Sequence, residues 1–189
     1  MDSKEKIVEF ASRMFWHAGY STTSPRQIMR ASEVGQGSFY HHFPTKSDLG
    51  QVAIQRNARE VLTAASEMLR GDAPGLDRLC AYLLAQREVL AGCRAGGFTY
   101  DAGVMQVPEL HRLLSDAFAQ LQKLVEAVVA DAQRDGSLRD DLDPAEVAAM
   151  VVAVVQGGYV SARATGDPAT FDHAVHGAVT LLRAHTPSR

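Results

Sequence analysis

The chain has 189 residues, of which 46% are hydrophobic and 22% are charged. This balance is typical of a globular protein with a hydrophobic core, and it excludes a disordered chain. The net charge is −3 at pH 7, but residues 1–46 alone carry six Lys or Arg against four Asp or Glu. A mildly basic N-terminal segment on an acidic remainder is compatible with DNA binding through a small part of the surface.

The sequence has no feature that directs the protein to a membrane or out of the cell. The most apolar stretch, Val147–Val155, is about half of the roughly 20 residues that a membrane-spanning helix needs, so we expect no membrane partner. No apolar leader follows the first residues, which predicts a cytoplasmic location. Cys80 and Cys93 are too few for a disulfide framework, and we expect both to be reduced.

Helical periodicity without any strand pattern predicts an all-α fold of about nine helices. The first helix has apolar residues at helical spacing over 7–18 and ends at Gly19. The second begins at Ser24-Pro25, where serine is a cap and proline fits the first helical position. Gln27 completes a capping box.

The third helix, Gln36–Phe43, is short and is stopped by Pro44. Longer helices follow, and the stretch 91–108, with four glycines, is the least regular. We therefore divide the chain into a three-helix head, residues 1–47, and a helical body, residues 48–189. The expected longer helices cover about residues 45–70, 76–90, 109–134, 143–165 and 167–185.

Two short helices joined by a tight turn predict a helix-turn-helix, whose second helix lies in the major groove of DNA. Phe39 and Phe43 are spaced to anchor this second helix on Ile28 and Leu49. Polar side chains on it, and the starts of the neighbouring helices, are suited to base edges and phosphates. The predicted DNA-binding residues are Thr23, Ser24, Gln36, Gly37, Ser38, Tyr40, His41, His42 and Lys46.

Residues 7–49 closely resemble the DNA-binding domain of TetR-family transcriptional regulators. The residues that carry the resemblance are Ile7, Ala11, Phe15, Gly19–Thr23, Ile28, Val34, Gly37 and Tyr40–Leu49. In the body, Gly92-Cys93, Gln156–Gly158 and Ala162-Arg163 are similar to the LmrA/YxaF-type subgroup. The resemblance implies a homodimeric, ligand-responsive regulator of the repressor type, which a small molecule releases from a palindromic DNA operator.

The turn of the helix-turn-helix departs from the family pattern at two positions. Glu33 stands where a glycine commonly adopts a left-handed conformation, which costs other residues roughly 1 kcal/mol. Gly35 replaces the usual serine cap, a milder loss because glycine also caps helices. An acidic side chain close to the DNA backbone should also weaken non-specific affinity.

The body contains a helix that is apolar on all sides around Val147–Val155 and must be covered on every side. One side can face the core of its own chain, and the other predicts a second subunit, which the family resemblance also implies. A helix buried within one chain is the alternative. The predicted dimer-interface residues are Val151, Val155, Gly158, Ala162, Val175 and Val179.

Apolar residues with a few polar ones in the middle helices suit a pocket for a hydrophobic small molecule. Ordinary core packing is the alternative for each of them. The predicted effector-binding residues are Leu62, Leu83, Gln86, Phe98, Tyr100, Met105, Leu113, Phe118, Gln156 and Tyr159.

Other functions receive less support from the sequence. An all-α enzyme or ligand carrier would use the same body pocket, but no metalloprotease, phosphate-loop or dinucleotide motif is present. A helix-turn-helix that no longer binds DNA is a further alternative. We expect no cofactor and no metal site, since His173 and His176 lack further ligands at matching spacing, and we interpret Cys93 as a packed thiol.

Overall fold

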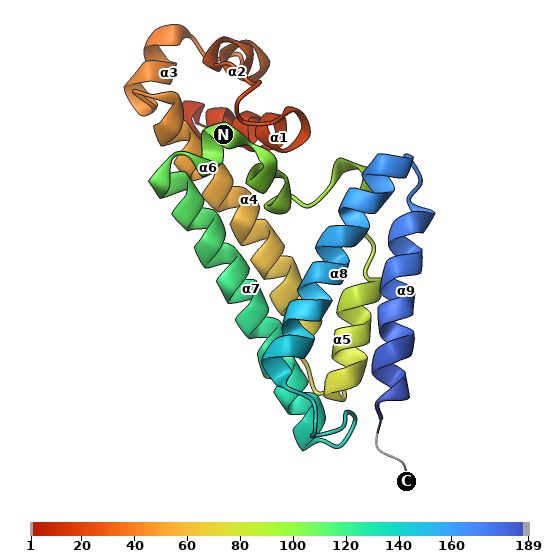
Figure 1. The fold of residues 1–189 in the computed structure, drawn as a ribbon. Coiled ribbons are helices and arrows are strands. Elements are labelled where there is room, and N and C mark those ends of the chain that lie inside the picture. The colour runs from red at the N-terminus through yellow and green to blue at the C-terminus, as the bar shows by residue number, and fades with distance from the viewer. Residues whose placement is uncertain (1, 187–189) are drawn as a thin grey trace. The chain divides into compact units, whose positions relative to one another are not determined.

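The computed structural model describes residues 2–186, and within that range it contains nine α-helices, two short 3-10 helices and no strand (Figure 1). The predicted all-α fold is confirmed. The elements in chain order are α1 (Ser3–Ala18), α2 (Pro25–Ser32), α3 (Gln36–His42), α4 (Lys46–Leu69), α5 (Gly75–Leu84), η1 (Val89–Ala91), η2 (Gly96–Tyr100), α6 (Ala102–Met105), α7 (Pro108–Arg134), α8 (Pro144–Thr165) and α9 (Ala169–Ala184).

The chain forms two compact units. The first, here called the head unit, contains the chain up to Val61 together with Arg94–Ala117. The second, the body unit, contains Leu62–Cys93 and the chain from Phe118 onward. These units differ from the predicted division between residues 47 and 48. Leu49, Ala53 and Ile54, in the first half of α4, are buried in the hydrophobic cluster of the head unit.

The core of the head unit combines the first four helices with the later segment that begins at Arg94. Ile7 and Phe15 lie on one side of α1 at helical spacing, and both are buried. Phe98 and Leu110, from the later segment, are buried in the same cluster. The helix-turn-helix therefore rests on a core that is completed by residues from a distant part of the chain.

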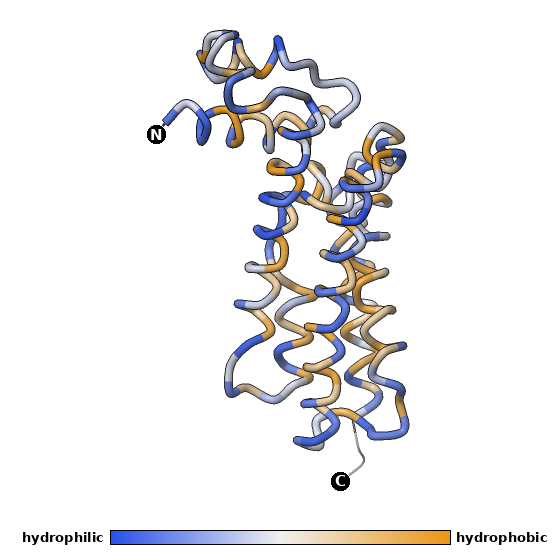
Figure 2. Tube along the Cα trace, turned by 90° about the vertical axis from the view of Figure 1, so that its left-hand side faces the viewer, coloured by the Kyte–Doolittle hydropathy of each residue, from blue (hydrophilic) through white to orange (hydrophobic). Residues whose placement is uncertain are grey.

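The body unit is built around α5, α8 and α9, which lie side by side (Figure 1). Hydrophobic and hydrophilic residues alternate along most helices of the chain (Figure 2), as expected for helices that bury one face. Helix α8 is the apolar exception and, among the described residues, the one helix long and apolar enough to cross a membrane by length and composition. Because core helices can have the same length and composition, this property alone is weak evidence for a membrane span.

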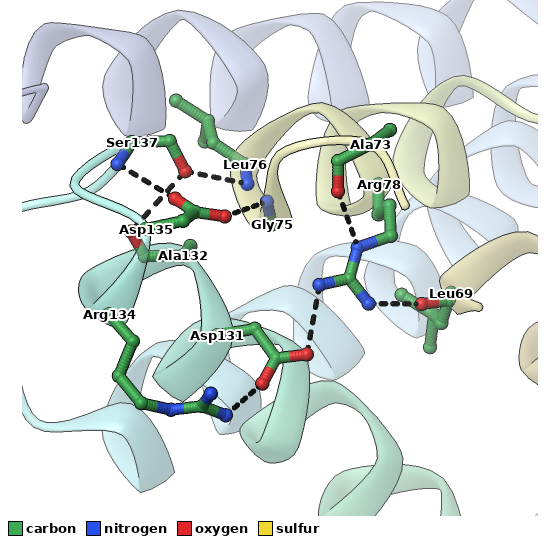
Figure 3. A network of polar contacts seen from close by, with 10 residues as sticks. All are labelled: Leu69, Ala73, Gly75, Leu76, Arg78, Asp131, Ala132, Arg134, Asp135 and Ser137. Carbon is green, nitrogen blue, oxygen red and sulfur yellow. Dashed lines mark hydrogen bonds and ion pairs between the residues drawn. The ribbon is translucent and has the colours of Figure 1, made fainter. Parts of the chain in front are cut away.

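Polar contacts fix the start of α5 against the end of α7 (Figure 3). The Asp135 carboxylate accepts hydrogen bonds from the backbone N–H of Gly75 at 2.7 Å and of Ser137 at 2.9 Å. Burial alone would raise the pKa of Asp135, but the hydrogen bonds from Ser137 and Gly75 outweigh it and lower the pKa. Gly75 leaves no room for a side chain, because an added Cβ would lie 2.4 Å from the backbone nitrogen of Ala132.

Helix α5 is shorter than the sequence predicts. It ends at Leu84, whereas the periodicity predicts a continuous helix over 76–90. The Arg87 guanidinium donates hydrogen bonds to the carbonyl groups of Tyr82 and Leu83 in the last turn, the second at 3.1 Å. The last carbonyl groups of a helix lack partners within the helix. Arg87 supplies donors for them, so it caps α5 and stabilises its end at Leu84.

Candidate nucleic-acid interface

Helix α2 begins with the capping box that the sequence predicts. The Ser24 hydroxyl accepts a hydrogen bond from the Gln27 N–H at 3.3 Å, and the Gln27 side-chain oxygen accepts one from the Ser24 N–H at 2.7 Å. Ser24 is exposed at the start of this helix, where a phosphate can bind.

Thr23 does not have the environment that was predicted for it. Its side chain is buried, and its hydroxyl donates a hydrogen bond to the carbonyl of Gly19 at 2.7 Å. Its backbone N–H is also used, in a hydrogen bond to the carbonyl of Tyr20 at 3.3 Å. We therefore correct the prediction that Thr23 binds a phosphate, because both of its donors close the turn after α1.

The turn between α2 and α3 contains the strained position that the sequence predicts. Glu33 has φ 55° and ψ 34°, and it is the one non-glycine residue within 2–186 that has a positive φ. A left-handed conformation costs a residue with a side chain about 1–2 kcal/mol. Gly35 is the N-cap of α3 in an extended conformation and supplies no side-chain cap, as expected.

Two aromatic side chains anchor α3 to the head unit. Phe39 and Phe43 are both buried, and they belong to the same hydrophobic cluster as Ile28 and Leu49. The predicted anchoring is confirmed. Because the four side chains come from α2, α3, α4 and the connection before α4, the orientation of α3 is fixed by packing on both of its neighbours.

The opposite side of α3 presents the predicted DNA-binding residues. The Tyr40 ring packs edge-on against the Phe39 ring, with centroids 5.2 Å apart, and leaves 42% of Tyr40 exposed. This contact restricts the direction of the Tyr40 hydroxyl. Gln36, Gly37, Tyr40 and His41 are exposed, and Ser38 and His42 are half-buried.

Lys46 is held against the turn that precedes α2. Its ammonium group lies 4.4 Å from the centre of the Tyr20 ring, and it donates a hydrogen bond to the carbonyl of Ser21 at 3.4 Å. Burial lowers the pKa of Lys46, and the nearby negative charge of Asp101 partly offsets this effect. The ammonium group has three donors, so these contacts leave capacity for a phosphate oxygen.

The residues predicted to contact an effector have different environments. Leu83 and Phe98 are buried in the cores of the body and head units respectively, so their role is packing. Gln86 is exposed, and Tyr100 is 77% exposed. The other six are half-buried, namely Leu62, Met105, Leu113, Phe118, Gln156 and Tyr159.

The residues predicted for the dimer interface are corrected by the structure. All six are buried within the body unit of a single chain, so they form its core and are closed to a partner. The same two helices also have exposed positions. Eight of them, here called the α8–α9 surface, are Ala153, Gly157, Val160 and Ala164 of α8 and His173, Gly177, Thr180 and Leu181 of α9.

The cysteine and histidine side chains that the sequence singles out lie in the described part of the chain. Cys80 and Cys93 are buried thiols, and His173 and His176 lie exposed on α9. Within residues 2–186, no three His, Cys, Asp or Glu side chains lie close enough together to hold a metal ion.

The geometry of α2 and α3 defines a class of protein. A capped helix, a tight turn and a second short helix with buried anchors and an exposed polar side form a helix-turn-helix, which places its second helix in the major groove. The head unit is therefore a DNA-binding module.

The chain belongs to the TetR family of transcriptional regulators. Residues 7–51 match the family of bacterial regulatory proteins of the tetR type, and residues 74–178 match the tetracyclin repressor-like C-terminal domain. The two matches include the helix-turn-helix and most of the body unit. The protein is thus a DNA-binding transcriptional regulator.

Individual relatives agree with this assignment. The HTH-type transcriptional repressor DhaR of Mycobacterium sp. strain GP1 is 31% identical over 82% of this chain and 79% of its own length. The regulator UidR of Escherichia coli K12 is 22% identical over 82% of this chain and 79% of its own. The reduced form of E. coli NemR has the same fold, with a TM-score of 0.86 over 99% of this chain and 100% of its own at 20% identity. The narrower resemblance to the LmrA/YxaF-type subgroup stays a prediction.

Proposed function

We propose that the protein is a cytoplasmic, homodimeric repressor that a small hydrophobic molecule releases from a palindromic operator. In this proposal α3 reads the operator. Gln36 and Ser38 contact base edges, Gly37 allows close approach, and Tyr40 and His41 bind phosphates. The remaining phosphate contacts come from Ser24, His42 and Lys46.

The observation that carries the proposal is the two-sided character of α3. Phe39 and Phe43 are at most 2% exposed, whereas Gln36, Tyr40 and His41 in the same short segment are exposed. Because its buried apolar side fixes the position of α3 before DNA binds, little conformational entropy is lost when its polar side contacts DNA. The relatives DhaR of Mycobacterium sp. strain GP1 and AcnR of Corynebacterium efficiens are named transcriptional repressors, which supports repression as the direction of the effect.

The roles of the α3 residues are tested with a fluorescein-labelled duplex that the wild-type protein selects from a random pool. Lys46→Ala and Tyr40→Phe should both weaken binding to all sequences alike. Only Lys46→Ala removes a positive charge, so it should also reduce the salt slope by about 0.9, whereas Tyr40→Phe should leave the slope nearly unchanged. Gln36→Ala should instead change the preferred base. The matched control is Gln51→Ala, a half-buried glutamine of α4 outside the proposed surface. If all three variants bind like the control, the assignment of α3 is wrong.

Dimerisation is proposed to occur through the α8–α9 surface. Small or apolar side chains at Ala153, Gly157 and Val160 recur at helical spacing on the exposed side of α8, and Val160 is 47% exposed. Two helices can approach closely where residues are this small, and a two-fold axis would then present two copies of α3 to the halves of a palindrome. A second subunit would also remove the exposed apolar side chains of α8 from water.

Gln156 and Tyr159 are the residues we propose for effector recognition in the body unit. Both are half-buried on α8, and the Tyr159 ring lies 5.0 Å from the Phe171 ring. Burial raises the pKa of the Tyr159 hydroxyl further above its ordinary value of 10.0, and the hydroxyl is a neutral hydrogen-bond donor at physiological pH. Tyr159→Phe removes only this donor, so it should weaken the effect of an active compound from a hydrophobic library on DNA release. Equal response of Tyr159→Phe and wild type would remove Tyr159 from the proposed site.

A further inference from the structure

Asp101 connects a distant part of the chain to the turn before α2. Its carboxylate accepts a hydrogen bond from the backbone N–H of Ser21 at 2.7 Å and a second one from the Ser21 hydroxyl. It also accepts one from the N–H of Gly103 at 2.9 Å, which caps α6. Asp101 and Ser21 are 80 positions apart in sequence and both belong to the head unit.

Gly103 lies close to this contact. A Cβ added to Gly103 would lie 2.4 Å from the Ser21 hydroxyl oxygen, so a larger residue there would displace that hydroxyl. Burial alone would raise the pKa of Asp101, but hydrogen bonds from Ser21, Gly103 and Val104 outweigh it and lower the pKa. The carboxylate is therefore charged at neutral pH, and its hydrogen bonds are of the stronger, charge-assisted kind.

The same turn holds Lys46 in place. The Ser21 carbonyl accepts the hydrogen bond from the Lys46 ammonium group at 3.4 Å, and the Tyr20 ring lies beneath that group. The Tyr20 ring is itself fixed, since it packs edge-on against Phe15 and lies 2.8 Å from where a Cβ on Gly50 would be. The Asp101 carboxylate thus binds the N–H and the hydroxyl of Ser21, and the carbonyl of Ser21 in turn binds the Lys46 ammonium group.

We propose that Asp101 is a positioning residue for operator binding, which acts by fixing Ser21 and through it the Lys46 ammonium group. The proposal rests on the proposed role of Lys46 as a phosphate contact. It makes the segment around α6 part of the DNA-binding apparatus, although this segment lies outside the helix-turn-helix in sequence. The segment would act on DNA affinity without touching DNA.

The positioning effect of Asp101 and the electrostatic effect of its negative charge should change DNA affinity in opposite directions, so an experiment can distinguish them. Removing a negative charge from a DNA-binding unit should strengthen DNA binding. Loss of the positioning contact should weaken DNA binding. The side chain of Asn presents an N–H₂ group to one of the N–H or O–H groups that donate a hydrogen bond to the Asp101 carboxylate, so that hydrogen bond is lost. Asp101→Asn should therefore bind the selected duplex about three- to tenfold more weakly, the size of one net hydrogen bond.

The experiment is a double-mutant cycle, measured by fluorescence anisotropy on the selected duplex over a range of salt concentrations. Asp101→Asn should reduce the salt slope and weaken binding in the wild-type background. In Lys46→Ala only the charge effect remains, so Asp101→Asn should cause no loss of binding there and at most a small gain. The matched control is Asp135→Asn, which removes a carboxylate that caps backbone N–H groups in the body unit. It should lower thermal stability and leave the salt slope unchanged.

A second variant breaks the same contact without changing charge. Gly103→Ala should push the Ser21 hydroxyl away and weaken binding, although alanine is the better helix former. Gly97→Ala, in the same segment but with no atom within 4 Å of the added Cβ, should bind like wild type. Stronger binding by Asp101→Asn, or an equal loss in both Lys46 backgrounds, would overturn the positioning role. If the wild-type protein selects no duplex at all, the proposed function itself fails, and the positioning role with it.

Discussion

Single residues explain where this head unit departs from an ideal helix-turn-helix. The strain at Glu33 could be predicted from the family resemblance, because Glu33 stands where TetR-family regulators commonly have a glycine in a left-handed conformation. The contact between Asp101 and Ser21 could not, since nothing local in either segment indicates a partner 80 positions away.

Glu33→Gly and Glu33→Gln separate strain from charge at this turn. Glycine removes both, so Glu33→Gly should raise the free energy of unfolding by about 0.5–1 kcal/mol and also strengthen DNA binding at low salt. Glutamine removes only the charge, so Glu33→Gln should strengthen binding without a gain in stability. Urea unfolding and anisotropy titrations measure the two effects. A stability gain for Glu33→Gln as large as that for Glu33→Gly would show that strain is not the cause.

The elements follow the sequence closely where their signals are local. Asp143 caps α8 by accepting hydrogen bonds from the N–H of Ala145 at 2.7 Å and of Glu146 at 3.3 Å, and this start was predicted from the Asp-Pro pair. The dimer-interface residues were wrong for a physical reason. Val147–Val155 is apolar on every side, so the sequence contains no periodicity that shows which side of α8 packs within the chain.

The junction between α5 and α7 should depend on pH through Asp135. Because the folded-state pKa of this carboxylate is lowered, its contribution to stability is present above the ordinary pKa near 3.8 and is lost as the pH falls through the folded-state value. Asp135→Asn should therefore destabilise the protein at pH 7, and its difference from wild type should shrink in acid below the ordinary pKa. Thermal unfolding across this range measures the difference. A constant difference at all pH values would contradict the role of the charged form.

Close packing at the same junction is tested by one methyl group. Gly75→Ala would place its Cβ 2.4 Å from a backbone nitrogen of α7, which cannot rotate away. The expected loss is about 1–3 kcal/mol in the free energy of unfolding, measured with urea. Gly97→Ala, whose added Cβ meets nothing within 4 Å, is the control and should show no such loss.

Binding of a palindromic operator, as proposed, requires a dimer of the whole molecule that uses the exposed side of α8. Val160→Glu would bury a charge without a partner in that interface, at a cost of about 3–5 kcal/mol. The variant should be monomeric in sedimentation equilibrium, bind the selected duplex far more weakly and keep its helical content. Val52→Glu on α4, at 36% exposed, is the matched control and should remain dimeric. A dimeric Val160→Glu protein would place the interface elsewhere.

In the proposed function, the exposed side of α3 contacts the bases of an operator as part of a two-fold dimer. The most direct test is footprinting of the purified wild-type protein on the duplex it selects, at two salt concentrations. We predict a protected near-palindrome whose half-sites lie about one helical turn of DNA apart, with protection that falls steeply as salt rises. A single unpaired half-site would contradict the dimeric arrangement. Absence of any protected sequence at the lower salt concentration would contradict DNA reading by α3.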